Sequence, residues 1–60
     1  MTIKELRKTY NLTQTDVALK CEASLPTIQT WERGLGKPTG ERREKLLKLF
    51  TEYGEVYGEE

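Results

Sequence analysis

The sequence predicts an all-α domain of four to five helices. Apolar residues recur at helical spacing, cap residues precede several of these stretches, and no segment alternates apolar and polar residues long enough to form a strand. Sixty residues, 35% of them hydrophobic, suffice for one small core. We therefore predict a helical domain over residues 1–53 and an acidic tail over residues 54–60.

The first helix is expected to begin near Thr2 and to end at Asn11. Thr2 and Glu5 have the spacing of a capping box, in which each side chain satisfies a backbone N–H of the other residue. Asparagine tolerates the left-handed conformation that closes a helix. One buried stripe is expected at positions i, i+3 and i+7, namely Ile3, Leu6 and Tyr10.

Two short helices follow. Thr13 caps the first of them, with Asp16 three residues on, and Ser24 caps the second, with Pro26 in its first turn. Gly34 is expected to end the second helix. The inward-facing residues of the pair are Val17, Ala18, Cys21, Ile28 and Trp31.

The corner between these two helices, Cys-Glu-Ala, is too short for an antiparallel arrangement. Helices joined by so short a turn cross at a steep angle, which is the helix-turn-helix arrangement. Its second helix, residues 24–33, then projects as a ridge that fits the major groove of duplex DNA.

A loop over residues 35–40 leads to a fourth helix over about residues 41–53. Its core side is expected to comprise Leu46, Leu47, Phe50 and Tyr53. The spacing of Tyr53, Val56 and Tyr57 also allows a final turn or a short fifth helix, although Gly54 interrupts it.

The charges are unevenly distributed, although the net charge is zero. Residues 1–51 hold all ten basic and six acidic residues, a net charge of +4, whereas residues 52–60 hold four glutamates and no base. Because attraction of nucleic acid depends on the local face, this composition permits a DNA partner.

The sequence gives no support for an enzyme or for a membrane-spanning protein. The chain has no histidine, no phosphate-binding loop and no apolar run of membrane-spanning length, so we expect no enzyme, metal, cofactor, small-molecule ligand or membrane association. Cys21 is expected to be a small buried hydrophobe. A single cysteine without a secretion signal indicates a cytoplasmic protein.

Residues 3–50 resemble the Cro/C1-type (XRE-like) helix-turn-helix family, which has the lambda-repressor-like fold. The matching motifs are Ile-Lys-Glu-Leu-Arg in the first helix, Leu-Thr-Gln opening the second, Trp-Glu-Arg-Gly ending the third, and Lys-Pro in the loop beyond, together with the separate residues Ala18, Ser24, Thr27 and Ile28. The resemblance implies a transcriptional regulator, most like a phage or mobile-element repressor, that binds double-stranded DNA at a palindromic operator.

The resemblance also assigns roles to individual residues. Side chains at the outer positions of the third helix would contact bases and the flanking backbone: Leu25, Pro26, Thr27, Gln29 and Thr30. Gln29 suits a bidentate contact to adenine, whereas Leu25 and Pro26 offer only apolar contact. Leu25 has an equal alternative role as a core staple at the helix start.

Phosphate contacts are implied for Thr13, Gln14, Ser24, Arg33, Lys37, Arg42 and Arg43. Arg42 and Arg43 have the alternative of pairing with Glu41 and Glu44 along the fourth helix. The family pattern also implies a partly buried ion pair between Arg7 and Glu32 that fixes an angle between helices, with Trp31 in the core.

Two further interpretations stay open. Zero net charge, the acidic tail and the apolar pair of Leu25 and Pro26 favour a protein-interaction module, such as an antitoxin or transcription-complex adaptor, that keeps the fold with weak DNA binding. The other interpretation, which we rank lowest, is the DNA-binding part of a longer protein. A homodimer is expected through the fourth helix and the tail, using Leu49, Phe50, Tyr53, Val56 and Tyr57, unless these residues close the monomer core.

Overall fold

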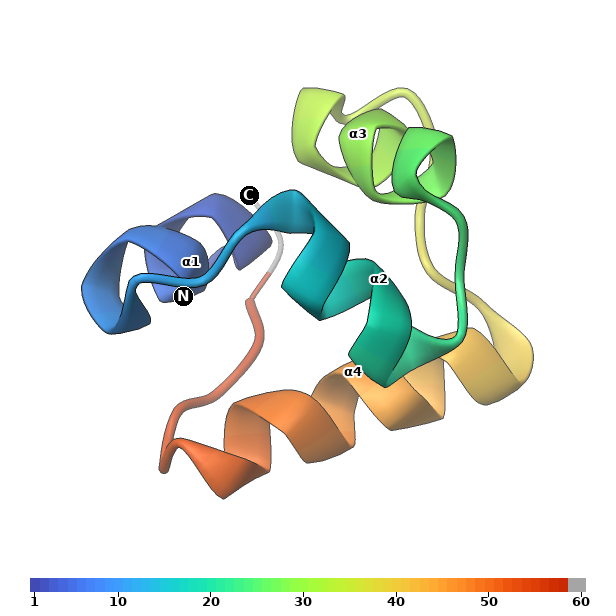
Figure 1. Cartoon of the computed structure of the whole chain (residues 1–60). Coiled ribbons are helices and arrows are strands. Elements are labelled where there is room, and N and C mark those ends of the chain that lie inside the picture. The colour runs from blue at the N-terminus through green and yellow to red at the C-terminus, as the bar shows by residue number, and fades with distance from the viewer. Residues whose placement is uncertain (59–60) are drawn as a thin grey trace.

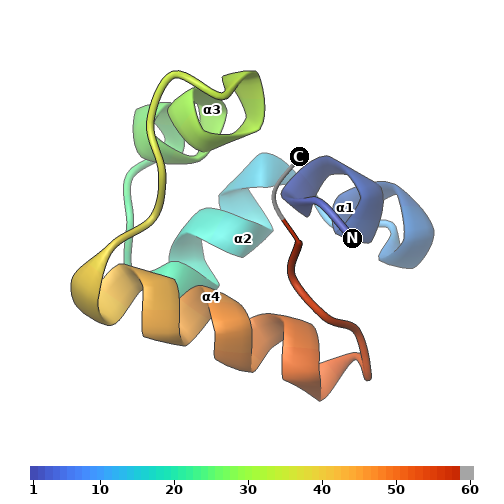
Figure 2. The same ribbon diagram turned by 180° about the vertical axis from the view of Figure 1, so that it is seen from behind.

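The computed structural model describes residues 1–58 and confirms the all-α fold. Over that range the backbone forms four helices and no strand. Figures 1 and 2 show α3 at one end of the molecule, standing away from α1, with the C-terminal segment running back from the end of α4 to α1. The helices are α1 (Ile3–Tyr10), α2 (Gln14–Cys21), α3 (Leu25–Arg33) and α4 (Gly40–Glu52).

Three helices begin at the predicted caps. Thr2 Oγ accepts a hydrogen bond from the Glu5 N–H at 3.2 Å, and the Glu5 carboxylate accepts one from the Thr2 N–H at 2.8 Å. Thr13 and Asp16 repeat this capping box at 3.0 and 2.9 Å. Ser24 Oγ accepts from a first-turn N–H of α3 at 3.4 Å. These bonds satisfy N–H groups that a helix leaves without partners.

The same helices end in left-handed residues. Asn11 and Gly34 have φ values of 57° and 76°, as predicted from their residue types. Glu22, between α2 and α3, also has a positive φ of 54°, which its sequence did not indicate. This residue makes the steep corner, with its carboxylate 2.7 Å from the Lys45 ammonium of α4.

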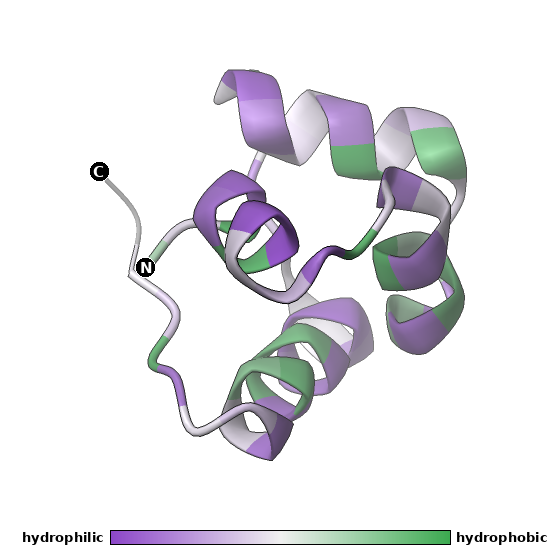
Figure 3. Cartoon of the chain, turned by 60° about the vertical axis from the view of Figure 1, so that its left-hand side comes forward, coloured by the Kyte–Doolittle hydropathy of each residue, from purple (hydrophilic) through white to green (hydrophobic). Residues whose placement is uncertain are grey.

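The core lies where all four helices meet. Figure 3 shows the hydrophobic sides of the helices facing one another. Leu47, which we placed on the core side of α4, is half-buried, whereas Leu49 is 2% exposed. The buried hydrophobic residues are Ile3, Leu6, Val17, Ala18, Cys21, Ile28, Leu46, Leu49 and Phe50.

The expected dimer surface is largely the monomer core. Leu49 and Phe50 are buried, so they are not available to a second chain. Tyr53 and Tyr57 are half-buried and pack against the same core. Val56 is the one member that is strongly exposed, at 80%.

Residues 54–58 form no helix, so the suggested final turn or fifth helix is wrong. Gly54 takes a φ of 71° and redirects the chain after α4. The segment then lies against the N-terminus: the Met1 ammonium donates to the Val56 carbonyl at 3.0 Å, and the Gly58 N–H donates to the Met1 carbonyl at 2.9 Å. Glu59 and Glu60 of the predicted tail lie outside the described residues.

Two side-chain contacts fasten this segment further. The Tyr10 hydroxyl donates to a Glu55 carboxylate oxygen at 2.5 Å, and the rings of Phe50 and Tyr57 are 5.1 Å apart. The hydrogen bond to Glu55 raises the pKa of the Tyr10 phenol above its ordinary value. The C-terminal segment therefore closes the core over α1 and α4.

The predicted ion pair between Arg7 and Glu32 connects α1 to α3. Arg7 Nε and Nη2 donate to the two carboxylate oxygens of Glu32 at 2.8 and 2.9 Å, a bidentate geometry. The Arg7 side chain is 19% exposed and that of Glu32 is 8% exposed. The hydrogen bonds to Glu32 raise the pKa of the guanidinium. Planar bidentate pairs fix orientation more strongly than single contacts.

Replacing Glu32 by Gln is expected to lower the free energy of unfolding by about 1–3 kcal/mol, because it leaves a part-buried guanidinium without its counter-charge. Urea unfolding measures the change. Glu22→Gln is the matched control, since its carboxylate pairs with Lys45 but is 73% exposed, and should leave stability nearly unchanged. Equal effects of the two substitutions would contradict a structural role for the Arg7–Glu32 pair.

Cys21 is expected to make the domain lose stability in alkali. Burial raises the pKa of its thiol from the ordinary value of 9.0 to about 11. The thiol therefore loses its proton at a lower pH in the unfolded state than in the folded state. The free energy of unfolding is unaffected well below pH 9.0 and falls by up to about 1.4 kcal/mol per pH unit as pH rises from there toward 11.

Thermal melts of the wild type and Cys21→Ala between pH 7.5 and 9.5 test this expectation. Ionisation of Tyr10 contributes little below pH 10. The melting temperature of the variant should therefore fall less steeply with rising pH than that of the wild type. The same slope in both proteins would contradict it.

Candidate functional site

Helix α3 is attached to the domain along one side only. Ile28 is its one fully buried residue, and Trp31 packs partly buried against the core beside it. Glu32, on the same side, is held by Arg7. The opposite side of α3 faces outward, and Pro26 and Arg33 on it are exposed. The structure therefore presents the helix as the ridge that its sequence predicts.

A glutamine pair links the outer side of α3 to the start of α2. Gln29 Nε2 donates to Gln14 Oε1 at 3.3 Å, and both side chains are half-buried. A primary amide has two N–H donors and an acceptor oxygen. Within residues 1–58 this is the only hydrogen bond of the Gln29 side chain, so one N–H and the oxygen remain for a partner. The spacing of 15 residues between the two glutamines gave no sequence signal for this contact.

The hydroxyl-bearing residues of α3 are held by the protein itself. Ser24 Oγ and Thr27 Oγ1 lie 2.8 Å apart, so that one of the two hydroxyls donates a hydrogen bond to the other. Thr30 Oγ1 donates to the Pro26 carbonyl at 2.9 Å. The Thr30 methyl faces the loop, because a Cβ added to Gly36 would lie 3.1 Å from it. Thr27 and Thr30 are half-buried, and neither is a freely projecting side chain.

Leu25 has no part in the core. Its two expected roles were a base contact and a core staple at the start of α3. The staple positions, one residue before the cap and four after it, are filled by Ala23, which packs against the core, and by buried Ile28. Leu25 is 39% exposed and is absent from the core cluster. The structure therefore removes the staple interpretation.

Basic residues follow α3 along the chain. Arg33 ends the helix, Lys37 lies in the loop, Arg42 and Arg43 lie in the first turn of α4, and all four residues are exposed. The alternative pairing of the two α4 arginines with glutamates of their own helix is not formed among the described residues. Thr13 and Gln14 stand at the start of α2, and Ser24 stands at the start of α3.

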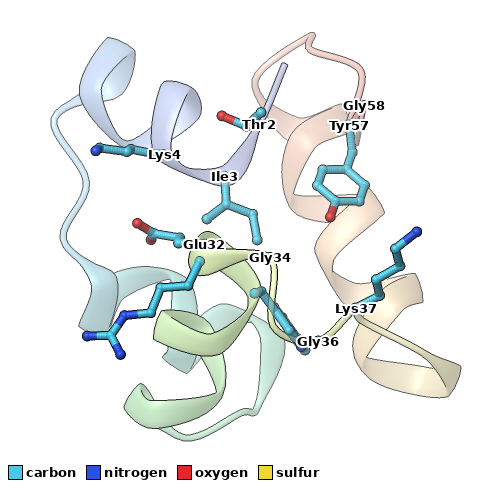
Figure 4. Close-up of a pocket in the computed structure, with 11 residues that line it drawn as sticks. Thr2, Ile3, Lys4, Glu32, Gly34, Gly36, Lys37, Tyr57 and Gly58 are labelled. Atoms are coloured by element: carbon cyan, nitrogen blue, oxygen red, sulfur yellow. The ribbon is translucent and has the colours of Figure 1, made fainter. Parts of the chain in front are cut away.

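A cavity of about 430 Å³ lies between the start of α1, the end of α3 and the C-terminal segment. Figure 4 shows Ile3 directed into it and the side chains of Lys37 and Tyr57 on one side. Its one carboxylate, Glu32, is already paired with Arg7. It holds no arrangement of a nucleophile with a base, and the described residues include no cluster of three or more side chains suited to a metal ion.

No helix among residues 1–58 is both long and apolar enough to cross a membrane.

A family model described as helix-turn-helix matches residues 3–52, which include all four helices. No curated protein and no solved structure matches the chain.

Proposed function

Because the chain belongs to the Cro/C1-type helix-turn-helix family, whose domains are DNA-binding regulators, we propose that it is a repressor of the phage or mobile-element type. It is a DNA-binding domain of a non-enzymatic family, and its partner is double-stranded DNA. In our proposal, residues 24–33 enter the major groove of a palindromic operator in the cytoplasm.

The observation that carries the proposal is the outward side of α3 with Gln29 oriented by Gln14. Adenine presents an acceptor, N7, and a donor, the N6 amino group, in the major groove. The remaining N–H and oxygen of Gln29 match that pair. The hydrogen bond to Gln14 restricts the Gln29 amide before DNA arrives, which lowers the entropy lost on binding.

Phosphate contacts flank this helix in the proposal. N–H groups at the start of α2, with Thr13 and Gln14, favour an anion, as do those at the start of α3 with Ser24. On the other side, Arg33, Lys37, Arg42 and Arg43 supply positive charge. These contacts set the position of the helix on the duplex, and base contacts set the sequence.

A palindromic operator requires two copies of the chain, because one helix covers only a short half-site. Burial of Leu49 and Phe50 restricts the proposed homodimer contact to exposed parts of α4 and the C-terminal segment. Val56 is the exposed apolar residue of that segment.

A second function has its own support. An interaction module would use exposed apolar residues for its partner, and Leu19, Leu35 and Val56 are each more than 70% exposed. An interaction module such as an antitoxin or transcription-complex adaptor would bind DNA weakly. A mobility shift on random duplex at low salt separates the two: no shift at low ionic strength favours the adaptor.

Selection from a randomised duplex pool tests the proposed function. We expect enrichment of two half-sites related by two-fold symmetry and spaced by about one helical turn. A pool that stays random after repeated rounds would contradict sequence-specific binding.

Gln29→Ala is expected to relax the preference at one adenine by about 5- to 150-fold, which corresponds to about 1–3 kcal/mol for a bidentate contact. Competition binding against duplexes changed at each position measures it. Thr9→Ala, an exposed residue of α1, is the control and should retain the preference. An unchanged preference at every position in Gln29→Ala would exclude Gln29 from base contact.

Removing phosphate contacts is expected to change the salt dependence of binding. Arg33→Ala and Lys37→Ala should each reduce the magnitude of the slope of log K against log salt concentration by about 0.9. Each substitution should also weaken binding to all duplex sequences by the same factor. Lys8→Ala, with an exposed basic residue on α1, should leave the slope unchanged. Equal slopes for all four proteins would place Arg33 and Lys37 away from DNA.

A further inference from the structure

The first turn of α3 presents apolar surface where a DNA-binding helix meets the base edges. We propose that Leu25 and Pro26 contact the C5-methyl group of a pyrimidine in the major groove, within one or two base pairs of the adenine that Gln29 contacts. This inference rests on the proposed function and specifies what its operator half-site contains.

Leu25 has exposed apolar surface outside the core cluster. It is 39% exposed, it takes no part in the core, and the staple positions of α3 are filled by Ala23 and Ile28. Exposure of this surface costs free energy in the free protein, roughly 25 cal/mol per Å². Covering it with an apolar group of the DNA recovers that free energy.

The chemistry of the neighbouring residues excludes most other contacts. Pro26 has no backbone N–H to donate, and the Thr30 hydroxyl proton is used on the Pro26 carbonyl. One of the Ser24 and Thr27 hydroxyls donates its proton in a hydrogen bond to the other, so the pair has one hydroxyl proton left. Residues 25–31 carry no charge, so no arginine or lysine there can contact guanine. Among base edges in the major groove, the pyrimidine C5-methyl group is the apolar feature.

The spacing along α3 gives the distance to the adenine. Leu25 and Gln29 are four residues apart, so they lie on one side of the helix about 6 Å apart along its axis. Successive base pairs are separated by about 3.4 Å. The methyl group is therefore expected one or two base pairs from the adenine.

Two bases carry this methyl group, thymine and 5-methylcytosine. Both place it at the same position of the pyrimidine ring, so the apolar surface of Leu25 and Pro26 recognises the shared group.

Replacing thymine by deoxyuridine removes only the methyl group, and it tests the inference on the duplex obtained by selection. Each thymine of one half-site is replaced in turn, and the dissociation constant is measured by fluorescence anisotropy. We expect a loss of about fourfold at one or two positions next to the adenine identified with Gln29→Ala, as for burial of one methyl group.

Leu25→Ala should remove this sensitivity, so that thymine and deoxyuridine duplexes bind the variant equally. Leu35→Ala is the control, since it also shortens an exposed leucine but lies beyond α3. This variant should still bind the thymine duplex more tightly than the deoxyuridine duplex. Melting temperatures of both variants establish that they fold. A duplex with cytosine, or 5-methylcytosine, at the sensitive position shows whether the methylated base is a second source of the contact.

The outcomes separate the two proposals. Specific binding with no effect of deoxyuridine at any position would overturn the apolar contact and leave the proposed function intact. A selection that enriches no sequence would overturn the proposed function, and this inference with it.

Discussion

The attachment of α3 along a single side is the constraint on which the rest of this structure depends. Ile28 is fully buried, Trp31 packs beside it, and Glu32 is held in a bidentate pair by Arg7 of α1. A helix fixed by one narrow stripe can leave its other side accessible, and the ion pair restricts its angle without covering that side. Burial therefore uses one face of the nine residues of α3, and the proposed recognition of DNA uses the opposite face.

The corner before α3 sets the direction in which this face points. Glu22 adopts a left-handed conformation, which residues other than glycine and asparagine rarely take, and Ala23 then packs against the core. Ser24 begins α3 immediately afterwards. Because no flexible linker intervenes between α2 and α3, Gln14 and Gln29 come within hydrogen-bond distance.

Local interactions explain what the sequence predicted well. The capping boxes at Thr2 and Thr13 and the left-handed ends at Asn11 and Gly34 involve residues within one turn of one another, so residue type and spacing suffice to predict them. The ion pair between Arg7 and Glu32 spans 25 residues and was predicted only through the family resemblance. The helix-turn-helix followed from the length of the corner.

Long-range contacts account for what was missed. The path of residues 54–58 depends on hydrogen bonds between Met1 and residues 56 and 58, which no local pattern indicates. Leu49 lies three residues after Leu46 and so has the helical spacing of the core side, and it is 2% exposed. The expectation of Leu47 in its place, one residue after Leu46, departed from that spacing. At the candidate site, hydroxyl donors that the sequence left free for bases, such as that of Thr30, are bonded within α3.

Glu55 of the acidic tail and the basic residues near the loop between α3 and α4 lie in different segments of the structure. The acidic Glu55 is bonded to Tyr10 of α1, and residues 54–58 lie along the N-terminus, so this part of the tail is held by the domain. Basic residues instead continue from the end of α3 into the start of α4. A net charge of zero is thus compatible with a locally positive DNA-binding face.

The most direct test of the central claim is to map the DNA-contacting face on the intact chain by NMR. Duplex DNA is titrated into ¹⁵N-labelled protein, and the backbone and glutamine side-chain amide signals are followed. The account predicts that the largest shifts fall on residues 24–33, on the side chains of Gln14 and Gln29, and on the loop at Lys37. Largest shifts on the C-terminal half of α4 and residues 54–58, with α3 unaffected, would contradict it.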